Sequence, residues 1–439
     1  MTLASSKLWV GGILLISIGL RFLGLNQING PVFDEVFYPQ YGLLYLQGEE
    51  FFYAHPPLAN YLYAFAIWVY SLLPWVSIES YQNIELSSIE PISYRWINAL
   101  LGSFLCLIIY GICLLLTRNR MFAILASILV AIEGSLIVDS RIALANSFLL
   151  TFGFSGLYFF LRFYTHKGGW NNLISSGVFI AMAVSVKWSG LGFLLAGVCF
   201  VLLISNNQRK DLEQFTLRNS IYFGLIIAIT YTAIFLPDTY LNPNYSFFEK
   251  HQQILGYHQT MVTGNEHPYC SKWYTWPAML RPIGYFFESI PIDNGDTTSF
   301  FKAVHLLPNP FIYWFSSLSI ILMMVQLAIN PLTKSTQNQK EVLLQRFICL
   351  GYLTNFLPWA FVERCLFLYH YQTASVFSFL ALAWYLSKLL NSNKTQYRSI
   401  FVLCAVIILV SFLYWLPLNM GFLMPDYEFY RRMWFNNWI

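Results

Sequence analysis

Residues 30–58 read GPVFDEVFYPQYGLLYLQGEEFFYAHPPL and place the adjacent carboxylates Asp34 and Glu35 a short distance before His55. An apolar run at 8–25 precedes this stretch, and mostly apolar sequence follows it. Ionisable groups so close to membrane-like segments are costly, and they mark a functional site by default. The competing interpretation is a solvated loop between two helices.

Composition places the chain in a membrane. Hydrophobic residues make up 57% of the chain and charged residues 10%, with a mean hydropathy of +0.54, whereas soluble domains carry about 25% charged residues. Apolar segments run from end to end, so we predict one membrane domain over residues 1–439 and no separate soluble domain. The net charge of +4 forms no basic stripe, which argues against nucleic acid as a partner.

Apolar runs of about 20 residues predict the membrane spans. The candidates are 8–25, 96–116, 121–139, 142–161, 173–186, 188–204, 219–237, 311–329, 342–362, 365–386 and 400–416. The run 58–75 is also apolar, but we expect it to lie on or dip into the interface. If 58–75 does not cross the membrane, every Lys- and Arg-rich loop falls on the inner side. The loop 79–90, which is acidic and contains neither Lys nor Arg, then falls on the outer side. We therefore predict an all-α polytopic membrane protein with about eleven transmembrane helices, its N-terminus inside and its C-terminus outside.

Two long loops, 26–95 and 238–310, lie on the outer side in this topology, and the first should carry interfacial helices. Chemistry is expected on that face. Cys270 and Cys365 also fall outside the membrane, but an odd number of cysteines without regular spacing predicts no disulfide framework. We do not expect a bridge between these two.

Charged and ionisable side chains gather near the outer ends of the predicted spans. They are Asp34, Glu35, His55, Arg95, Glu133, Asp139, Arg141, Lys187, His267, Arg281, Glu363, Arg364 and His370. Singly they have simple explanations: Lys and Arg snorkel to head groups, one His packs against helices, and Asp139 pairs with Arg141. Together they suit group transfer from a lipid-linked phosphate donor, because Arg and Lys bind phosphate and a carboxylate activates an attacking hydroxyl. A transporter would place such groups near mid-membrane instead.

Short motifs surround these residues. They are Phe33-Asp34-Glu35, His55-Pro56-Pro57-Leu58, Tyr94-Arg95, Glu133-Gly134, Ser140-Arg141, Lys187-Trp188-Ser189-Gly190-Leu191, His267-Pro268-Tyr269, Trp276-Pro277, Arg281-Pro282, Glu363-Arg364 and Tyr369-His370-Tyr371. In these motifs, and through most of its length, the chain resembles the protein O-mannosyltransferases, which are GT-C glycosyltransferases that use polyprenyl-phosphate-mannose. The first two motifs look like the family's first-loop signature.

The resemblance implies inverting transfer of mannose to Ser or Thr hydroxyls of secreted or membrane proteins, on the extracytoplasmic side of the plasma (inner) membrane. Asp34 would be the general base, and Glu35 would help to position the acceptor or donor. Phosphate contacts would come from Arg95, Arg141, Lys187 and Arg364. The supporting residues would be His55, Pro56, Glu133, His267 and His370. A divalent cation is a further way to offset phosphate charge, with no ligands assigned.

Two features depart from the family pattern. Asn146 stands where many members carry an acid, and the loop 238–310 has no room for the β-trefoil module of eukaryotic members, which points to a bacterial-type enzyme. Two alternatives stay open at this level: a GT-C enzyme with a lipid or glycan acceptor, and a transporter or flippase.

Overall fold

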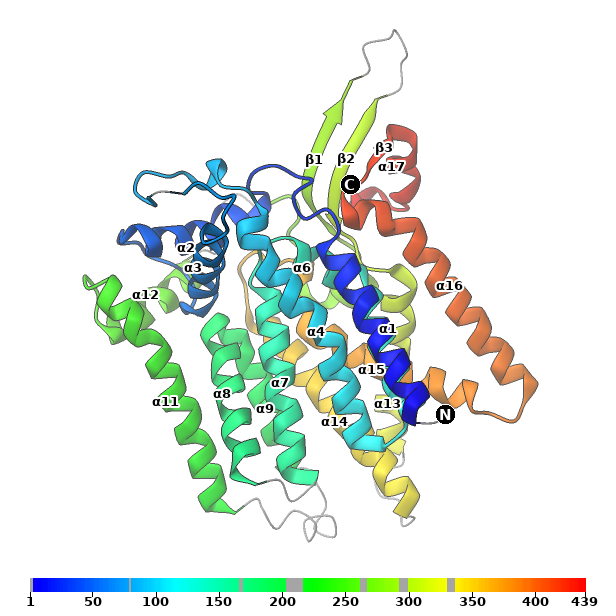
Figure 1. Cartoon of the computed structure of the whole chain (residues 1–439). Helices are drawn as coiled ribbons and strands as arrows, with labels where there is room; N and C mark the ends of the chain where they lie inside the picture. Colours follow the sequence, from blue (N-terminus) through cyan, green and yellow to red (C-terminus); the bar gives the residue numbers. More distant parts are fainter. Residues whose placement is uncertain are drawn as a thin grey trace.

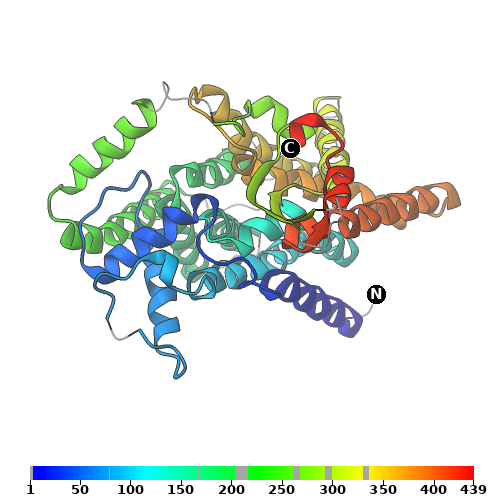
Figure 2. The same ribbon diagram turned by 90° about the horizontal axis from the view of Figure 1, so that it is seen from above.

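The computed structural model of the chain describes residues 3–78, 80–165, 169–202, 216–260, 267–291, 299–329 and 336–439. Long helices run beside one another through the body of the molecule (Figure 1). A β-hairpin and several short helices gather at one end, which is called the outer end below. Viewed from above (Figure 2), α16 projects from the side of the bundle.

The long helices follow the predicted spans. They are α1 (Leu3–Phe22), α4 (Ile92–Thr117), α5 (Arg120–Ile132), α6 (Gly134–Arg141), α7 (Asn146–Thr165), α8 (Trp170–Val186), α9 (Leu191–Leu202), α11 (Leu217–Leu241), α13 (Pro310–Ile329), α14 (Thr336–Phe356), α15 (Gln372–Leu390) and α16 (Thr395–Met420). A helix overlaps each of the eleven predicted runs, and the run 121–139 is divided between α5 and α6, which bend by 54°.

The described helices differ in whether they are long and apolar enough to cross a membrane. Among the described residues, six helices are long and apolar enough to cross a membrane, and the bent α5–α6 pair makes a seventh if it is one span. Two shorter apolar helices cover 170–186 and 188–202, the pair predicted to cross twice. The count of eleven therefore stays a prediction.

The first outer loop carries two short helices, α2 (Tyr38–Gln47) and α3 (Leu58–Ser71), as predicted. The apolar run 58–75 forms α3, whose 14 residues extend about 21 Å at 1.5 Å per residue. That is shorter than the roughly 30 Å hydrocarbon core of a bilayer. In Figure 1 both helices lie at the outer end.

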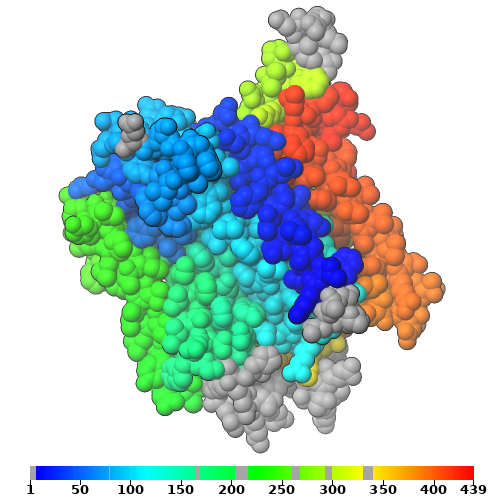
Figure 3. All heavy atoms as spheres, viewed as in Figure 1, coloured from blue at the N-terminus to red at the C-terminus, as the bar shows by residue number. Residues whose placement is uncertain are grey.

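The outer end also holds β-structure that the sequence analysis did not predict. Strands β1 (Ile283–Ile290) and β2 (Phe300–Leu306) form an antiparallel hairpin, and β3 (Leu423–Pro425) adds to β2, giving the order β1-β2-β3. Two further helices, α12 (Phe247–Thr260) and α17 (Asp426–Arg432), complete this end. The first outer loop and the hairpin form two separate elevations on the surface (Figure 3).

A buried ion pair fastens the first outer loop to the bundle. Arg95, in the first turn of α4, donates from Nε to Glu35 Oε1 at 2.8 Å and from Nη2 to Glu35 Oε2 at 2.7 Å. The two side chains are 1% and 0% exposed. The other three Arg95 N–H groups bond to the carbonyl oxygens of Leu25, Ile28 and Gly30. Glu35 also accepts from the backbone N–H groups of Val32 and Ala143. The pair thus joins the loop to α4 and to the turn after α6.

Replacing Arg95 by Met should destabilise the protein by about 3–5 kcal/mol, because it leaves the Glu35 carboxylate buried without its partner. The free energy of unfolding in detergent micelles measures the loss. The matched control is Arg398→Met at the exposed start of α16, which should change stability by no more than about 0.5 kcal/mol. Equal losses in the two variants would show that the ion pair does not hold the loop.

Candidate active site

The turn that carries Asp34 has an unusual backbone. Phe33 has a φ of +51°, a left-handed conformation that bulky residues rarely adopt. Its ring stacks on Tyr285 of β1, with 4.4 Å between centroids and 13° between planes. Such strain persists where the surroundings over-determine it, and it is concentrated at functional sites. Phe33 begins a short helix, Phe33–Val36, in which the side chain of Asp34 is partly exposed and that of Glu35 is buried.

Asp34 lies among groups that suit it to proton transfer. Its charged neighbours are Lys187 and Asp139, and Tyr369 also lies close to its carboxylate. Burial raises the pKa of the Asp34 carboxyl to about 6, while the Lys187 ammonium opposes that rise. A carboxylate with this pKa is unprotonated at neutral pH and is still basic enough to accept a proton from a reacting hydroxyl.

A cavity of about 620 Å³ opens next to Lys187. Its polar and ionisable lining includes His55, Lys187, Trp188, Ser189, His258, Gln259, Thr354, Asn355, Glu363, Arg364 and His370. This volume is in the range of small-molecule sites. Burial, followed by the charge of Lys187, holds the pKa of His55 well below its usual value, and burial followed by Arg364 lowers the pKa of His258. Both imidazoles are therefore neutral at pH 7, and Lys187 and Arg364 supply the positive charge of the cavity.

Lys187 occupies the break between α8 and the short helix Trp188–Gly190, as the sequence predicted. Its Nζ donates to Asn146 Oδ1 at 2.9 Å, and Asn146 Nδ2 donates to Asp139 Oδ2 at 2.7 Å. The amide therefore bridges an ammonium and a carboxylate. An acid at position 146 would set a second carboxylate against Asp139, so the departure from the family pattern fits its neighbours.

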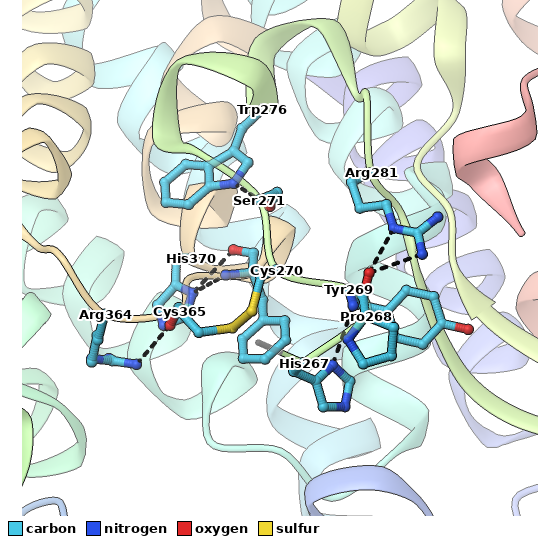
Figure 4. Close-up of a disulfide and its surroundings, with 11 residues drawn as sticks. His267, Pro268, Tyr269, Cys270, Ser271, Trp276, Arg281, Arg364, Cys365 and His370 are labelled. Atoms are coloured by element: carbon cyan, nitrogen blue, oxygen red, sulfur yellow. Dashed lines mark hydrogen bonds between the residues drawn. A yellow bond between two sulfur atoms is a disulfide. The ribbon is translucent and has the colours of Figure 1, made fainter. Parts of the chain in front are cut away.

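A disulfide joins Cys270 to Cys365 (Figure 4), with 5.3 Å between the Cα atoms. The expectation of two unpaired thiols is wrong. The two cysteines are 95 residues apart in the sequence, so their contact could not be predicted from local sequence. A backbone hydrogen bond next to the disulfide links the same two segments, since Ser271 N–H donates to the Leu366 carbonyl at 2.8 Å. The bridge fixes the segment after His267 to the segment that brings Arg364 into the cavity.

Several predicted site residues lie away from the cavity. Arg95 and Glu35 pair with each other. Arg141 donates to backbone carbonyls at the end of α1 and to Met420, rather than pairing with Asp139. Asp139 instead accepts from the Tyr285 hydroxyl at 2.7 Å and from Asn146. These contacts overturn the simple pairing weighed above.

Three further predicted residues also take places outside the cavity. Glu133 is 0% exposed and caps α6 by accepting from the N–H groups of Ser135 and Leu136. Pro56 is buried just before α3. His267 is exposed, and its ring meets the Phe367 ring edge-on at 5.3 Å.

Three residues of this region could not be assigned to the site from the sequence. His258 of α12 lines the cavity, Tyr369 lies close to Asp34, and Tyr285 stacks on Phe33 and donates to Asp139. Their places depend on contacts between distant segments, for which the sequence carried no signal beyond the Tyr369-His370-Tyr371 motif. Among the described residues, no three His, Cys, Asp or Glu side chains are grouped to hold a metal ion. The divalent cation therefore has no ligands assigned.

Comparison with known proteins identifies the family. Residues 12–249, more than half of the chain, match the model for dolichyl-phosphate-mannose-protein mannosyltransferases. Residues 243–438 match the model for the C-terminal four TMM region of protein-O-mannosyltransferase. The chain belongs to the protein O-mannosyltransferase family. The resemblance drawn from the sequence motifs is confirmed.

Individual relatives agree in sequence and in fold. The polyprenol-phosphate-mannose–protein mannosyltransferase of Corynebacterium glutamicum is 23% identical, over 97% of this chain and 92% of that protein. The S. cerevisiae protein O-mannosyltransferase Pmt1–Pmt2 complex, solved with its sugar donor, matches with a TM-score of 0.83 at 15% identity, over 100% of this chain and 93% of that chain. ArnT from Cupriavidus metallidurans, bound to undecaprenyl phosphate, matches at a TM-score of 0.55 and 11% identity, over 94% of this chain and 73% of that chain. The predicted GT-C-like membrane fold is confirmed.

The disulfide makes a direct prediction about thiol reactivity. A maleimide applied to the purified protein in detergent should label Cys270 and Cys365 only after a reductant has been added, because a bonded sulfur is not a nucleophile. Peptide masses report the labelled positions. In the Cys270→Ser control the remaining Cys365 should react without reductant. Labelling of both wild-type cysteines without reductant would contradict the bridge.

Proposed function

We propose that this chain transfers mannose from polyprenyl-phosphate-mannose to Ser or Thr hydroxyls of secreted or membrane proteins. The observation that carries the proposal is Asp34, with a pKa of about 6, next to a cavity whose positive charge comes from Lys187 and Arg364. In a member of this family, such a site offers a base for the acceptor and cations for a phosphate leaving group.

The proposed reaction is a single displacement. The acceptor hydroxyl oxygen attacks the anomeric carbon of mannose from the face opposite the phosphate, and its proton passes to the Asp34 carboxylate. The bond between the anomeric carbon and the phosphate oxygen breaks, and its electron pair leaves with polyprenyl phosphate. Lys187 and Arg364 offset the growing phosphate charge, and His55 and His370 contribute hydrogen bonds within the same cavity.

An apolar groove gives the lipid part of the donor a place. It has a volume of about 710 Å³ and is lined from α8, α9 and α11. The groove shares Trp188 and Leu191 with the charged cavity. We propose that the phosphate lies at Lys187 and Arg364 while the first isoprene units follow this groove.

The buried predicted residues receive structural roles in this proposal. Glu35 and Arg95 hold the turn that presents Asp34, so they position the base rather than contact the substrate. Arg141 and Glu133 fix the ends of α1 and α6, Pro56 lies just before the N-cap of α3, and His267 supports the aromatic contacts around Phe33. The whole chain, 1–439, would act as one catalytic unit.

The protein is an integral membrane protein, and we propose that its active site faces the extracytoplasmic side. The Lys- and Arg-rich loops all fall on the opposite side in the predicted topology. The Cys270–Cys365 bridge next to the cavity supports the same assignment, because disulfides persist in oxidising compartments.

Asp34→Asn should lower turnover on a Ser/Thr peptide by about 10²- to 10⁴-fold, the usual contribution of a positioned base. For the wild type, kcat/KM should fall as the pH drops below about 6, because the base must be unprotonated to accept the hydroxyl proton. The residual activity of Asp34→Asn should lack this acid limb. A folded variant with near-wild-type transfer would rule out Asp34 as the base.

Lys187→Met should raise the KM for the donor at least tenfold, because it removes a phosphate contact within the cavity. The control Lys272→Met removes a lysine that is exposed at the outer end, and should leave the donor KM unchanged. Donor titrations at saturating peptide measure both constants. Equal shifts in the two variants would point to a general loss of surface charge rather than to a phosphate site.

A further inference from the structure

Strand β1 has one unpaired edge. The sheet order is β1-β2-β3, so β1 pairs with β2 on one side only. Among the backbone hydrogen bonds of the described residues, none joins 284–290 to a segment other than β2. Figure 1 shows β1 on the side of the hairpin away from β3 and α17. Along the exposed outer half of the strand, residues 287–290, the outward N–H and C=O groups are therefore open to an added strand.

The same strand begins at the candidate active site. Tyr285, the third residue of β1, stacks on Phe33, the residue before Asp34. Its hydroxyl donates to Asp139, which is itself a charged neighbour of Asp34. From Tyr285 the strand runs outward to Ile290, a distance of about 17 Å at 3.3 Å per residue. A segment paired with this edge would therefore lead directly to the base.

The edge also lacks the features that usually prevent pairing. Natural edge strands carry Lys, Pro or inward charges that block a further strand. The sequence of β1 is IGYFFESI, with one Glu and neither Lys nor Pro. Its outer half carries partly exposed apolar side chains: Ile290 is 39% exposed, and Phe287 is 52% exposed while one part of its ring packs on Phe301 and Phe429. An exposed apolar edge of this kind is typical of a surface that binds another chain.

We infer that the acceptor polypeptide binds as an extended strand along the free edge of β1, with its Ser or Thr hydroxyl at Asp34. This rests on the proposed function, and it adds how the protein acceptor is held. Main-chain hydrogen bonds supply the affinity, so the site accepts many sequences provided that the flanking residues can be extended.

Backbone N-methylation of the acceptor tests the inference. In a peptide with one Thr, each of the five residues on either side is N-methylated in turn, which removes one N–H donor per peptide. Added strands bond to an edge through every second residue. Methylation at alternate positions on one side of the Thr should therefore raise the peptide KM about fivefold to tenfold, with kcat unchanged and little effect at the positions between. A uniform effect, or none, would overturn the inference.

A crosslinking pair locates the peptide on the protein. The photoreactive residue benzoylphenylalanine replaces Phe287 on β1. In the control it replaces Leu423 on β3, the strand at the opposite edge of the sheet, where the Leu423 side chain is 54% exposed. Crosslinks to a labelled acceptor peptide should form at position 287 and not at 423, and excess unlabelled peptide should suppress them. Equal yields at the two positions would overturn the β1 assignment.

The two proposals fail in different ways. If peptides accept mannose but show neither alternation nor a crosslink at β1, only the edge inference is lost. If no peptide accepts mannose while the purified protein is folded, the proposed function is lost.

Discussion

The ion pair between Glu35 and Arg95 is the contact on which the site depends. Two carboxylates stand next to each other in the sequence, and the fold gives them opposite environments. Glu35 is enclosed with an arginine whose five N–H groups all bond to protein, and Asp34 is left beside the cavity. A buried ion pair adds little net stability, since desolvation offsets the attraction, but breaking it costs several kcal/mol. Its consequence here is geometric: it leaves Asp34, the carboxylate proposed as the base, as the one beside the cavity.

The same division of roles applies to the cations. Arg95 and Arg141 are buried and bind backbone carbonyls or a carboxylate, so they stabilise the ends of helices where the chain leaves the bundle. Lys187 and Arg364 line the cavity instead. Arg21, within α1, also satisfies its donors internally, on Ser17, Ser140 and the Ala131 carbonyl. In an apolar environment a cation needs such partners. Lys187 and Arg364 have fewer hydrogen-bond partners within the protein, and they are the cations placed to bind a ligand.

The sequence predicted the fold better than it predicted the roles of residues. Hydropathy and charge bias placed a helix at every predicted run and assigned 58–75 to the first outer loop. Both signals can be read from the sequence without knowing which segments pack together. They could not separate Arg95 from Lys187, since both are cations near a helix end and only their contacts distinguish them. The Cys270–Cys365 bridge and the β1–β2 hairpin were missed for the same reason: both join or arrange segments whose local sequence has no regular pattern. The place of Asp34 beside a membrane-like segment singled it out, and the family resemblance implied its role as the base. Tyr285 and His258 emerged only from the packing.

One measurement tests the proposed transfer to protein most directly. The purified protein is given polyprenyl-phosphate-mannose labelled in the sugar, together with a Ser/Thr-rich peptide and a lipid extract as competing acceptors. The account predicts that the label enters the peptide, linked to a Ser or Thr oxygen with the anomeric configuration opposite to that of the donor. Label found only in lipid would keep the fold and the chemistry but contradict the protein acceptor, and a product with retained configuration would contradict the single displacement.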